Sequence, residues 1–86
     1  MYDKEPTRKF LSQQFSLLRH QLGITQVEMA RLLRISSRAY GDLERGKNCC
    51  SVETFLCMLM LLNKEEIWDL VAKYRFSAQQ RNPSLK

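Results

Sequence analysis

The chain has 86 residues, with 14 Lys and Arg against 9 Asp and Glu, so it is one small domain of net charge +5 that favours polyanionic partners. Its longest apolar run, residues 55–62, is too short to span a bilayer, which takes about 20 residues, and the charged start carries no secretion signal. Three cysteines, an odd number, form no disulfide framework, so we expect reduced thiols and a cytoplasmic protein.

The first predicted helix spans residues 7–22. Thr7 is positioned to cap its start, and Gly23 supplies a stop after its end. Its apolar residues are spaced by four, three and four, which puts them on one helix face. This stripe comprises Leu11, Phe15, Leu18 and Leu22.

Two short helices follow, over residues 25–33 and 36–45. Thr25 and Glu28 have the spacing of a capping box at the start of the first, and Gly46 closes the second in a left-handed conformation. Ser36 or Ser37 begins the second. The residues expected to face inward are Met29, Ala30, Leu33, Tyr40 and Leu43.

A fourth helix is expected to begin after Ser51 and run to about Leu62, and a fifth to run from an Asn63–Glu66 capping box to about Tyr74. Its inward residues are Ile67, Leu70, Val71 and Tyr74. The predicted organisation is therefore all-α, a compact five-helix bundle. It has a flexible start at 1–6, a domain at 7–75 and a polar tail at 76–86.

Two short helices joined by about three residues are typical of a helix-turn-helix. Ala30 is small where the helices must approach closely, and the apolar Ile35 fills the space beneath the bend. The outer face of the second short helix is small and polar, as entry into a DNA major groove requires. That face carries Ser37, Arg38, Gly41 and Asp42.

Three motifs occur together between Leu18 and Leu62: Thr25-Gln26, Ala30 four residues after the glutamine, and Glu44-Arg45-Gly46. In this combination the segment resembles the Xre/Cro family of phage-repressor helix-turn-helix domains. The resemblance implies a lambda-repressor-like fold and sequence-specific binding to double-stranded DNA.

The resemblance also implies roles for individual residues. Gln26 would bind a phosphate at a helix N-terminus, and Ser37 and Arg38 would read bases, Arg38 through guanine O6 and N7. Glu44 would form a structural ion pair with Arg19. The implied DNA-binding residues are Gln26, Ser36, Ser37, Arg38, Gly41, Asp42, Arg45, Lys47 and Asn48.

The chain departs from the family at Arg34, where the turn usually holds glycine, and at Gly41, a glycine inside the recognition helix. If residue 34 keeps a positive φ, arginine costs roughly 1 kcal/mol there. Asp42 would repel phosphates, so we expect it to face a cytosine amine or an arginine such as Arg38 or Arg45.

The run 55–62 carries a second apolar stripe, which the fifth and first helices cover or which forms a homodimer interface. The interface residues would be Leu56, Met60, Leu61 and Trp68. A two-fold dimer would read a pseudo-palindromic operator, most simply as a repressor. The alternative is an antitoxin-like module that holds a toxin on this stripe and regulates its own operon.

Other functions have weaker support in the sequence. The cysteines Cys49, Cys50 and Cys57 with His20 match no zinc spacing, and we expect no metal or cofactor. A redox role for the adjacent pair stays open, with loop filler the simpler interpretation. No catalytic arrangement is evident, so an enzyme is not expected.

Overall fold

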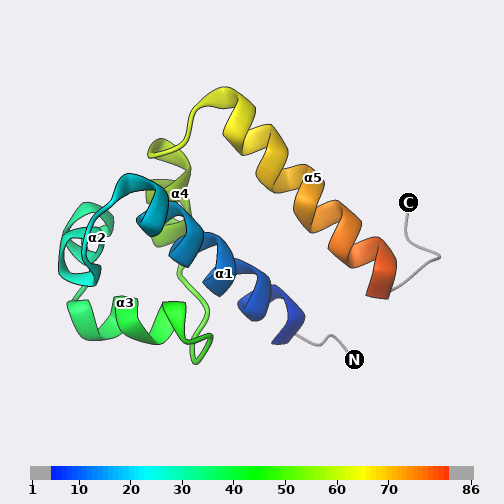
Figure 1. The fold of residues 1–86 in the computed structure, drawn as a ribbon. Helices are drawn as coiled ribbons and strands as arrows, with labels where there is room; N and C mark the ends of the chain where they lie inside the picture. The colour runs from blue at the N-terminus through cyan, green and yellow to red at the C-terminus, as the bar shows by residue number, and fades with distance from the viewer. Residues whose placement is uncertain (1–4, 82–86) are drawn as a thin grey trace.

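The computed structural model describes residues 5–81, which form five α-helices and no strand. The helices are α1 (Glu5–Leu22), α2 (Gln26–Leu33), α3 (Ser37–Glu44), α4 (Val52–Met60) and α5 (Lys64–Arg81). Figure 1 shows α2 and α3 at one end, α1 through the middle, and α5 antiparallel to α1 on the far side. The predicted all-α, five-helix architecture is confirmed.

Polar side chains fix the starts of four helices, where backbone N–H groups have no partner within the helix. Thr25 Oγ1 accepts from the Glu28 N–H at 3.1 Å, and Glu28 Oε1 accepts from the Thr25 N–H at 2.9 Å. Ser36, Ser51 and Asn63 each accept from the N–H three residues on, at 2.8 to 3.1 Å. The sequence placed all four caps correctly.

The core gathers where α1, α2 and α3 meet, with one side closed by α4 and Leu70 of α5. Tyr40 is fully buried, its ring is edge-on to Phe15 at 6.2 Å, and its hydroxyl donates to the Phe15 carbonyl at 3.2 Å. Because one buried ring ties α3 to α1, the angle of α3 is set by the core. The buried hydrophobic residues are Phe15, Leu18, Met29, Ala30, Leu33, Tyr40, Leu43, Met58 and Leu70.

The helix ends differ from the prediction at both termini. Helix α1 begins at Glu5, so Thr7 lies inside the helix, where its hydroxyl is 2.8 Å from the Tyr74 hydroxyl. Helix α5 continues to Arg81, so residues 76–81 are helical and not an irregular tail. Residues 1–4 and 82–86 of the two predicted tails lie outside the described residues. The α1–α5 contact joins residues far apart in the sequence, so no local pattern predicts it.

Two residues predicted to face inward do not. Leu22 is 45% exposed because the last turn of α1 extends past the core. Val71 is 52% exposed, and its side chain lines an apolar groove of about 340 Å³ between α5 and α1. Phe55 and Leu59 of α4 also line this groove, so Val71 faces a space that α1, α4 and α5 share.

The turn between α2 and α3 contains a strained residue. Arg34 has φ 62° and ψ 40°, the left-handed conformation, and its N–H bonds to the carbonyls of Ala30 and Arg31. A side chain with a Cβ costs roughly 1–2 kcal/mol in this conformation, where glycine costs little. The chain therefore keeps a cation in a position that glycine occupies at lower conformational cost.

We expect Arg34→Gly to raise the free energy of unfolding by about 0.5–1 kcal/mol, because relief of the Cβ clash exceeds the added entropy of the unfolded chain. Urea denaturation measures this. Arg34→Ala removes the same charge but keeps the Cβ, so it should show no such gain. Equal stabilisation by both variants would place the effect in the charge and contradict the conformational explanation.

Candidate DNA-binding interface

Helices α2 and α3 are joined by Arg34, Ile35 and Ser36, a connection short enough to hold the two helices at a sharp angle. Ile35 is half-buried against the core and its N–H bonds to the Ala30 carbonyl at 3.0 Å. Ala30 is 2% exposed, so its single methyl group allows α2 and α3 to pack closely. The pair therefore has the geometry of a helix-turn-helix.

The start of α3 is open to solvent. Ser36, Ser37 and Arg38 are all exposed, and no hydrogen bond or ion pair within residues 5–81 engages the Arg38 guanidinium. Lys47 and Asn48 are exposed in the turn after α3. Tyr40 and Leu43 are buried on the inner face of α3, so these exposed side chains lie on the solvent side of the helix and of the turn after it.

The middle of α3 differs from the prediction. Gly41 is buried, because the guanidinium of Arg45 and the amide of Gln26 lie over it. Asp42 pairs with Arg45, and its side chain is only 13% exposed against 65% for Arg45. The expectation that Gly41 lies open on the outer face is therefore wrong, and the cation presented there is Arg45.

We expect Gly41→Ala to raise the free energy of unfolding by about 1 kcal/mol, the cost of glycine in a helix interior. An added Cβ would lie 3.5 Å from Arg45 Nη1, which is ordinary contact distance. Thermal or urea unfolding measures the gain. The matched control is Gly46→Ala, where φ is 73° and a loss of stability is expected. Destabilisation by Gly41→Ala would contradict the packing described here.

The Glu44 carboxylate lies at the centre of a network behind α3. Arg19 donates to it from Nε at 2.6 Å and from Nη2 at 3.2 Å, and the Tyr40 hydroxyl also donates to it. Gln26 Nε2 donates to Glu44 Oε1 at 3.0 Å. Arg19 Nη1 reaches the Ile24 carbonyl at 3.1 Å, so one ion pair joins α1, the start of α2 and α3.

The network changes the titration of its members. Burial alone would raise the pKa of Glu44, but hydrogen bonds from Arg19, Tyr40 and Gln26 outweigh it and hold that pKa below its ordinary value. The hydrogen bond to Glu44 raises the pKa of Arg19, and burial raises the pKa of Tyr40. Near neutral pH the pair is ionised and the tyrosine hydroxyl keeps its proton.

Gln26 connects this network to the surface. It is exposed at the first residue of α2, and its amide is oriented by Glu44. The family resemblance implied the Arg19–Glu44 pair, but the contacts of Gln26 and Tyr40 with the same carboxylate were not predicted. The spacing of Tyr40 and Glu44, one helical turn apart, was a signal for one of them.

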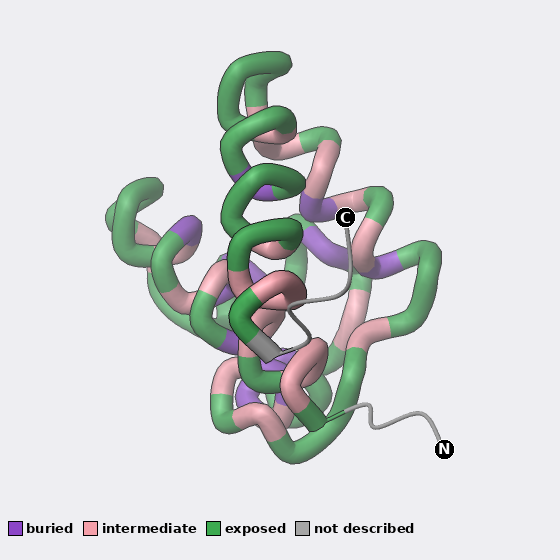
Figure 2. The backbone as a smooth tube through the Cα atoms, turned by 90° about the vertical axis from the view of Figure 1, so that its right-hand side faces the viewer, coloured by how far each residue is buried: buried purple, intermediate pink, exposed green. Residues whose placement is uncertain are grey.

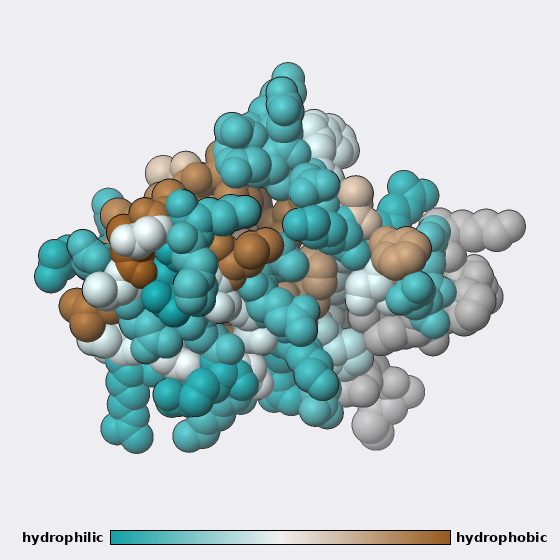
Figure 3. Space-filling view, viewed as in Figure 1, coloured by the Kyte–Doolittle hydropathy of each residue, from teal (hydrophilic) through white to brown (hydrophobic). Residues whose placement is uncertain are grey.

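Cations surround the open face of α3. Figure 3 shows hydrophilic side chains over the lower left of the molecule, where Figure 1 places α3. The stretch from residue 31 to residue 47 carries five cations and two anions, and the burial pattern leaves all five cations exposed. They are Arg31, Arg34, Arg38, Arg45 and Lys47.

The four residues predicted to form the homodimer interface differ in how far they are exposed. Leu56, Met60 and Trp68 are 52%, 83% and 67% exposed. Leu61 is half-buried and packs against the core, as does Cys57, so part of the second stripe is intrasubunit core. None of the described helices has the length and apolar character needed to cross a membrane.

The cysteines differ in exposure. Cys49 is exposed, and Cys50 and Cys57 are half-buried. Burial raises the pKa of the Cys50 thiol to about 11. Since the thiolate is the reactive form, this environment lowers the reactivity of Cys50 at neutral pH.

A short helix–turn–helix pair with an open, cation-lined second helix defines a class of DNA-binding domain. The family model described as "Helix-turn-helix" matches residues 16–68, well over half of the chain. The chain belongs to the Xre/Cro-like helix-turn-helix family, with its lambda-repressor-like all-α fold, which is a family of DNA-binding regulators and not of enzymes. No curated protein and no solved structure matched the chain.

Proposed function

We propose that the chain is a transcriptional repressor that binds a pseudo-palindromic operator as a homodimer, with α3 in the major groove of each half-site. The observation that carries this proposal is the exposed Arg38, engaged by no hydrogen bond or ion pair within residues 5–81, at the start of a helix whose opposite face is anchored by Tyr40 and Leu43. A side chain so placed is able to reach base edges when the helix enters a groove about 12 Å wide.

In this proposal the contacts divide into two kinds. Ser37 and Arg38 read bases, Arg38 by paired hydrogen bonds to guanine. Gln26 and Ser36 contact phosphate at helix N-termini, where exposed N–H groups favour an anion. The remaining backbone contacts come from Arg45, Lys47 and Asn48. Asp42 acts through Arg45, with which it forms an ion pair in the free protein.

Exposed apolar side chains on α4 and α5 support the homodimer. Two copies related by a two-fold axis would place their recognition helices about 34 Å apart, one turn of DNA. A DNA-binding domain of this kind represses most simply by excluding polymerase from the operator. Its expected place of action is the cytoplasm, where such an operator is accessible.

Selection of bound duplexes from a random pool tests the proposal. The expected product is a pseudo-palindrome with a guanine at the same place in each half-site and half-site centres about 10 base pairs apart. Affinity for that duplex should fall steeply as salt rises, because several phosphates are neutralised. Enrichment of no sequence, or a binding constant independent of salt, would overturn it.

An antitoxin-like module is the second candidate function. It is favoured by Leu56 and Met60, which are apolar and exposed on α4 although that helix already contributes to the core. In this case the pure chain would sediment as a monomer and would bind a toxin protein through α4, while still regulating its operon. A pure chain that dimerises and binds an operator unaided supports the repressor.

A further inference from the structure

A polar groove of about 300 Å³ lies between the first half of α1 and the end of α3. The α1 residues that line it are spaced by four, three and one, which puts them on one helix face. Every lining residue is charged, polar or glycine, so the groove is suited to a charged ligand. The lining residues are Glu5, Lys9, Ser12, Gln13, Arg45 and Gly46.

The contacts of Ser12 fix how α1 meets the end of α3. Ser12 is only 8% exposed, and its hydroxyl donates to the Lys9 carbonyl at 2.8 Å. A Cβ added to Gly46 would lie 3.5 Å from the same hydroxyl oxygen, so the backbone of Gly46 packs beside this turn of α1. Lys9 is therefore held near the residue that precedes Lys47, one of the side chains expected to contact the DNA backbone.

Arg45 joins the groove to the outer face of α3. Its guanidinium lies over Gly41 in the middle of that helix, and the same side chain lines the groove. The groove is therefore continuous with the surface that enters DNA in the proposed complex. A DNA strand contacted by Arg45 passes beside α1.

The charges around the groove favour an anion. Lys9 is exposed, and no hydrogen bond or ion pair within residues 5–81 engages its ammonium group. Arg45 already pairs with Asp42, and Glu5 is the one acid among the lining residues. With Lys47 there are three cations against these two acids, so this corner of the molecule complements a polyanion.

We propose that Lys9 is a further DNA-backbone contact, which binds the phosphate next to the one that Lys47 binds on the same strand. The inference rests on the proposed DNA binding and extends the interface to α1, before the residues that match the family. A DNA phosphate is favoured over a free phosphate ion because DNA is held by the neighbouring contacts, whereas a free ion would depend on Lys9 beside the carboxylate of Glu5.

The salt dependence of DNA binding tests the contact. Lys9→Gln should lower the slope of log K against log salt by about 0.9 for each bound subunit, the share of one phosphate. Affinity for the selected operator and for random duplex should fall by the same factor, about 3- to 10-fold, because a phosphate contact carries no sequence information. Lys9→Arg keeps the charge and should keep the slope.

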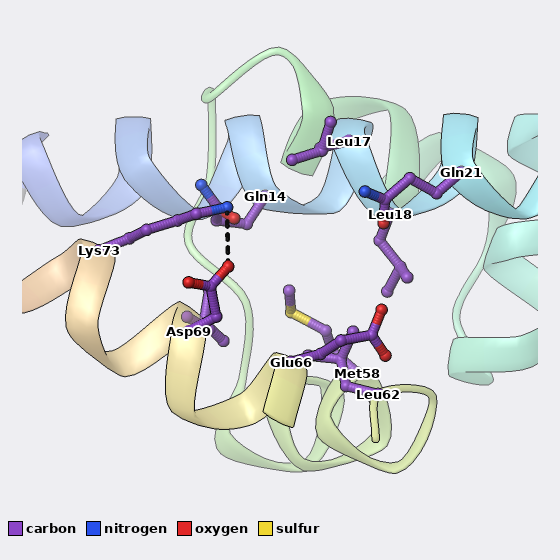
Figure 4. A pocket seen from close by; sticks show the side chains of 10 residues that line it. Gln14, Leu17, Leu18, Gln21, Met58, Leu62, Glu66, Asp69 and Lys73 are labelled. Carbon is purple, nitrogen blue, oxygen red and sulfur yellow. Dashed lines mark ion pairs between the residues drawn. The ribbon is translucent and has the colours of Figure 1, made fainter. Parts of the chain in front are cut away.

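The matched control is Lys73→Gln. Lys73 is an exposed lysine that pairs with Asp69 at 3.5 Å beside the opposite flank of α1 (Figure 4). It belongs to α5, which lies across α1 from α3 in Figure 1 and is mostly exposed along its length in Figure 2. Its loss should change neither affinity nor slope. Melting curves of both variants establish that they are folded.

Ethylation interference locates the contact on the DNA. Ethylation of one phosphate should weaken the wild type and have no effect on Lys9→Gln, and that phosphate should adjoin the one whose effect Lys47→Gln abolishes. Loss of the same interference in Lys73→Gln would overturn the assignment. So would binding of inorganic phosphate at Lys9, followed by amide NMR, together with an unchanged salt slope on DNA.

The two proposals fail separately. A wild type that selects an operator, with Lys9→Gln as dependent on salt as the wild type, overturns the α1 contact and leaves operator binding untouched. A chain that enriches no sequence but binds random duplex with a slope that Lys9→Gln lowers supports the contact and removes the operator-binding function. A chain that binds no duplex overturns both.

Discussion

Arg38→Ala is expected to lower affinity for the selected operator by about 10- to 100-fold while changing affinity for random duplex by no more than about threefold. A bidentate arginine–guanine contact contributes about 1–3 kcal/mol of discrimination against other bases. Arg38 is one of five exposed cations between residues 31 and 47, so its loss removes only a small part of the sequence-independent attraction.

Titration of both duplexes at one fixed salt concentration measures the two affinities. Arg31→Ala is the matched control, because it removes an exposed arginine from α2 and should weaken both duplexes to the same small extent. Methylation of guanine N7 should interfere with binding of the wild type and not of Arg38→Ala. Equal losses on the two duplexes for Arg38→Ala would show that this side chain reads no base.

Glu44→Ala is expected to lower the free energy of unfolding by about 3 kcal/mol, because it leaves the Arg19 charge with no carboxylate in a largely covered site. The side chains of Arg19 and Glu44 are only 16% and 9% exposed. The variant also leaves the Tyr40 hydroxyl with one acceptor fewer. A chain of this size has a total stability of roughly 4–13 kcal/mol, so the loss is a large share.

Urea unfolding measures this loss of stability. Two further variants serve as controls that identify its cause. Asp69→Ala breaks an exposed pair with Lys73 and should cost less than about 0.5 kcal/mol. Arg19→Leu/Glu44→Leu removes both charges, so it should be more stable than Glu44→Ala alone. A cost for Glu44→Ala as small as that for Asp69→Ala would show that the network does not hold α3 to α1.

The same pair predicts a response to acid. The pKa of Glu44 is held below its ordinary value of 4.5, so its contribution to stability is complete above that pH and is lost as the pH falls through the folded-state pKa. The stability difference between the wild type and Glu44→Gln should therefore be constant from neutral pH to about pH 5 and shrink below it. A difference that grows on acidification would contradict this sign.

Much of the fold was predictable because its signals are local. A capping box needs only two residues three apart, and Thr25–Glu28 forms as its spacing predicted. The inward position of Tyr40 was expected from the stripe it shares with Leu43, whereas the positive φ at Arg34 was only one of the alternatives that the family's usual glycine left open. The Arg19–Glu44 pair came from family resemblance, since no spacing rule joins residues so far apart.

The errors concern contacts that depend on tertiary structure. Tyr74 of α5 contacts Thr7 and Phe10, residues at the other end of the chain, and no local pattern predicts that pairing. Gly41 is buried because two long side chains, Arg45 and Gln26, fold over it. A helical pattern gives the direction of a Cβ but not the course of an arginine that bends back across its own helix.

The most direct test of the central claim is amide NMR of the labelled chain titrated with the selected duplex. The largest chemical-shift changes should map to the first turn of α2, to α3 around Ser37 and Arg38, and to the turn at Lys47. The outward face of α5 should change little once the protein is dimeric. Changes concentrated on α4 or α5, with α3 unaffected, would contradict insertion of α3 into the major groove.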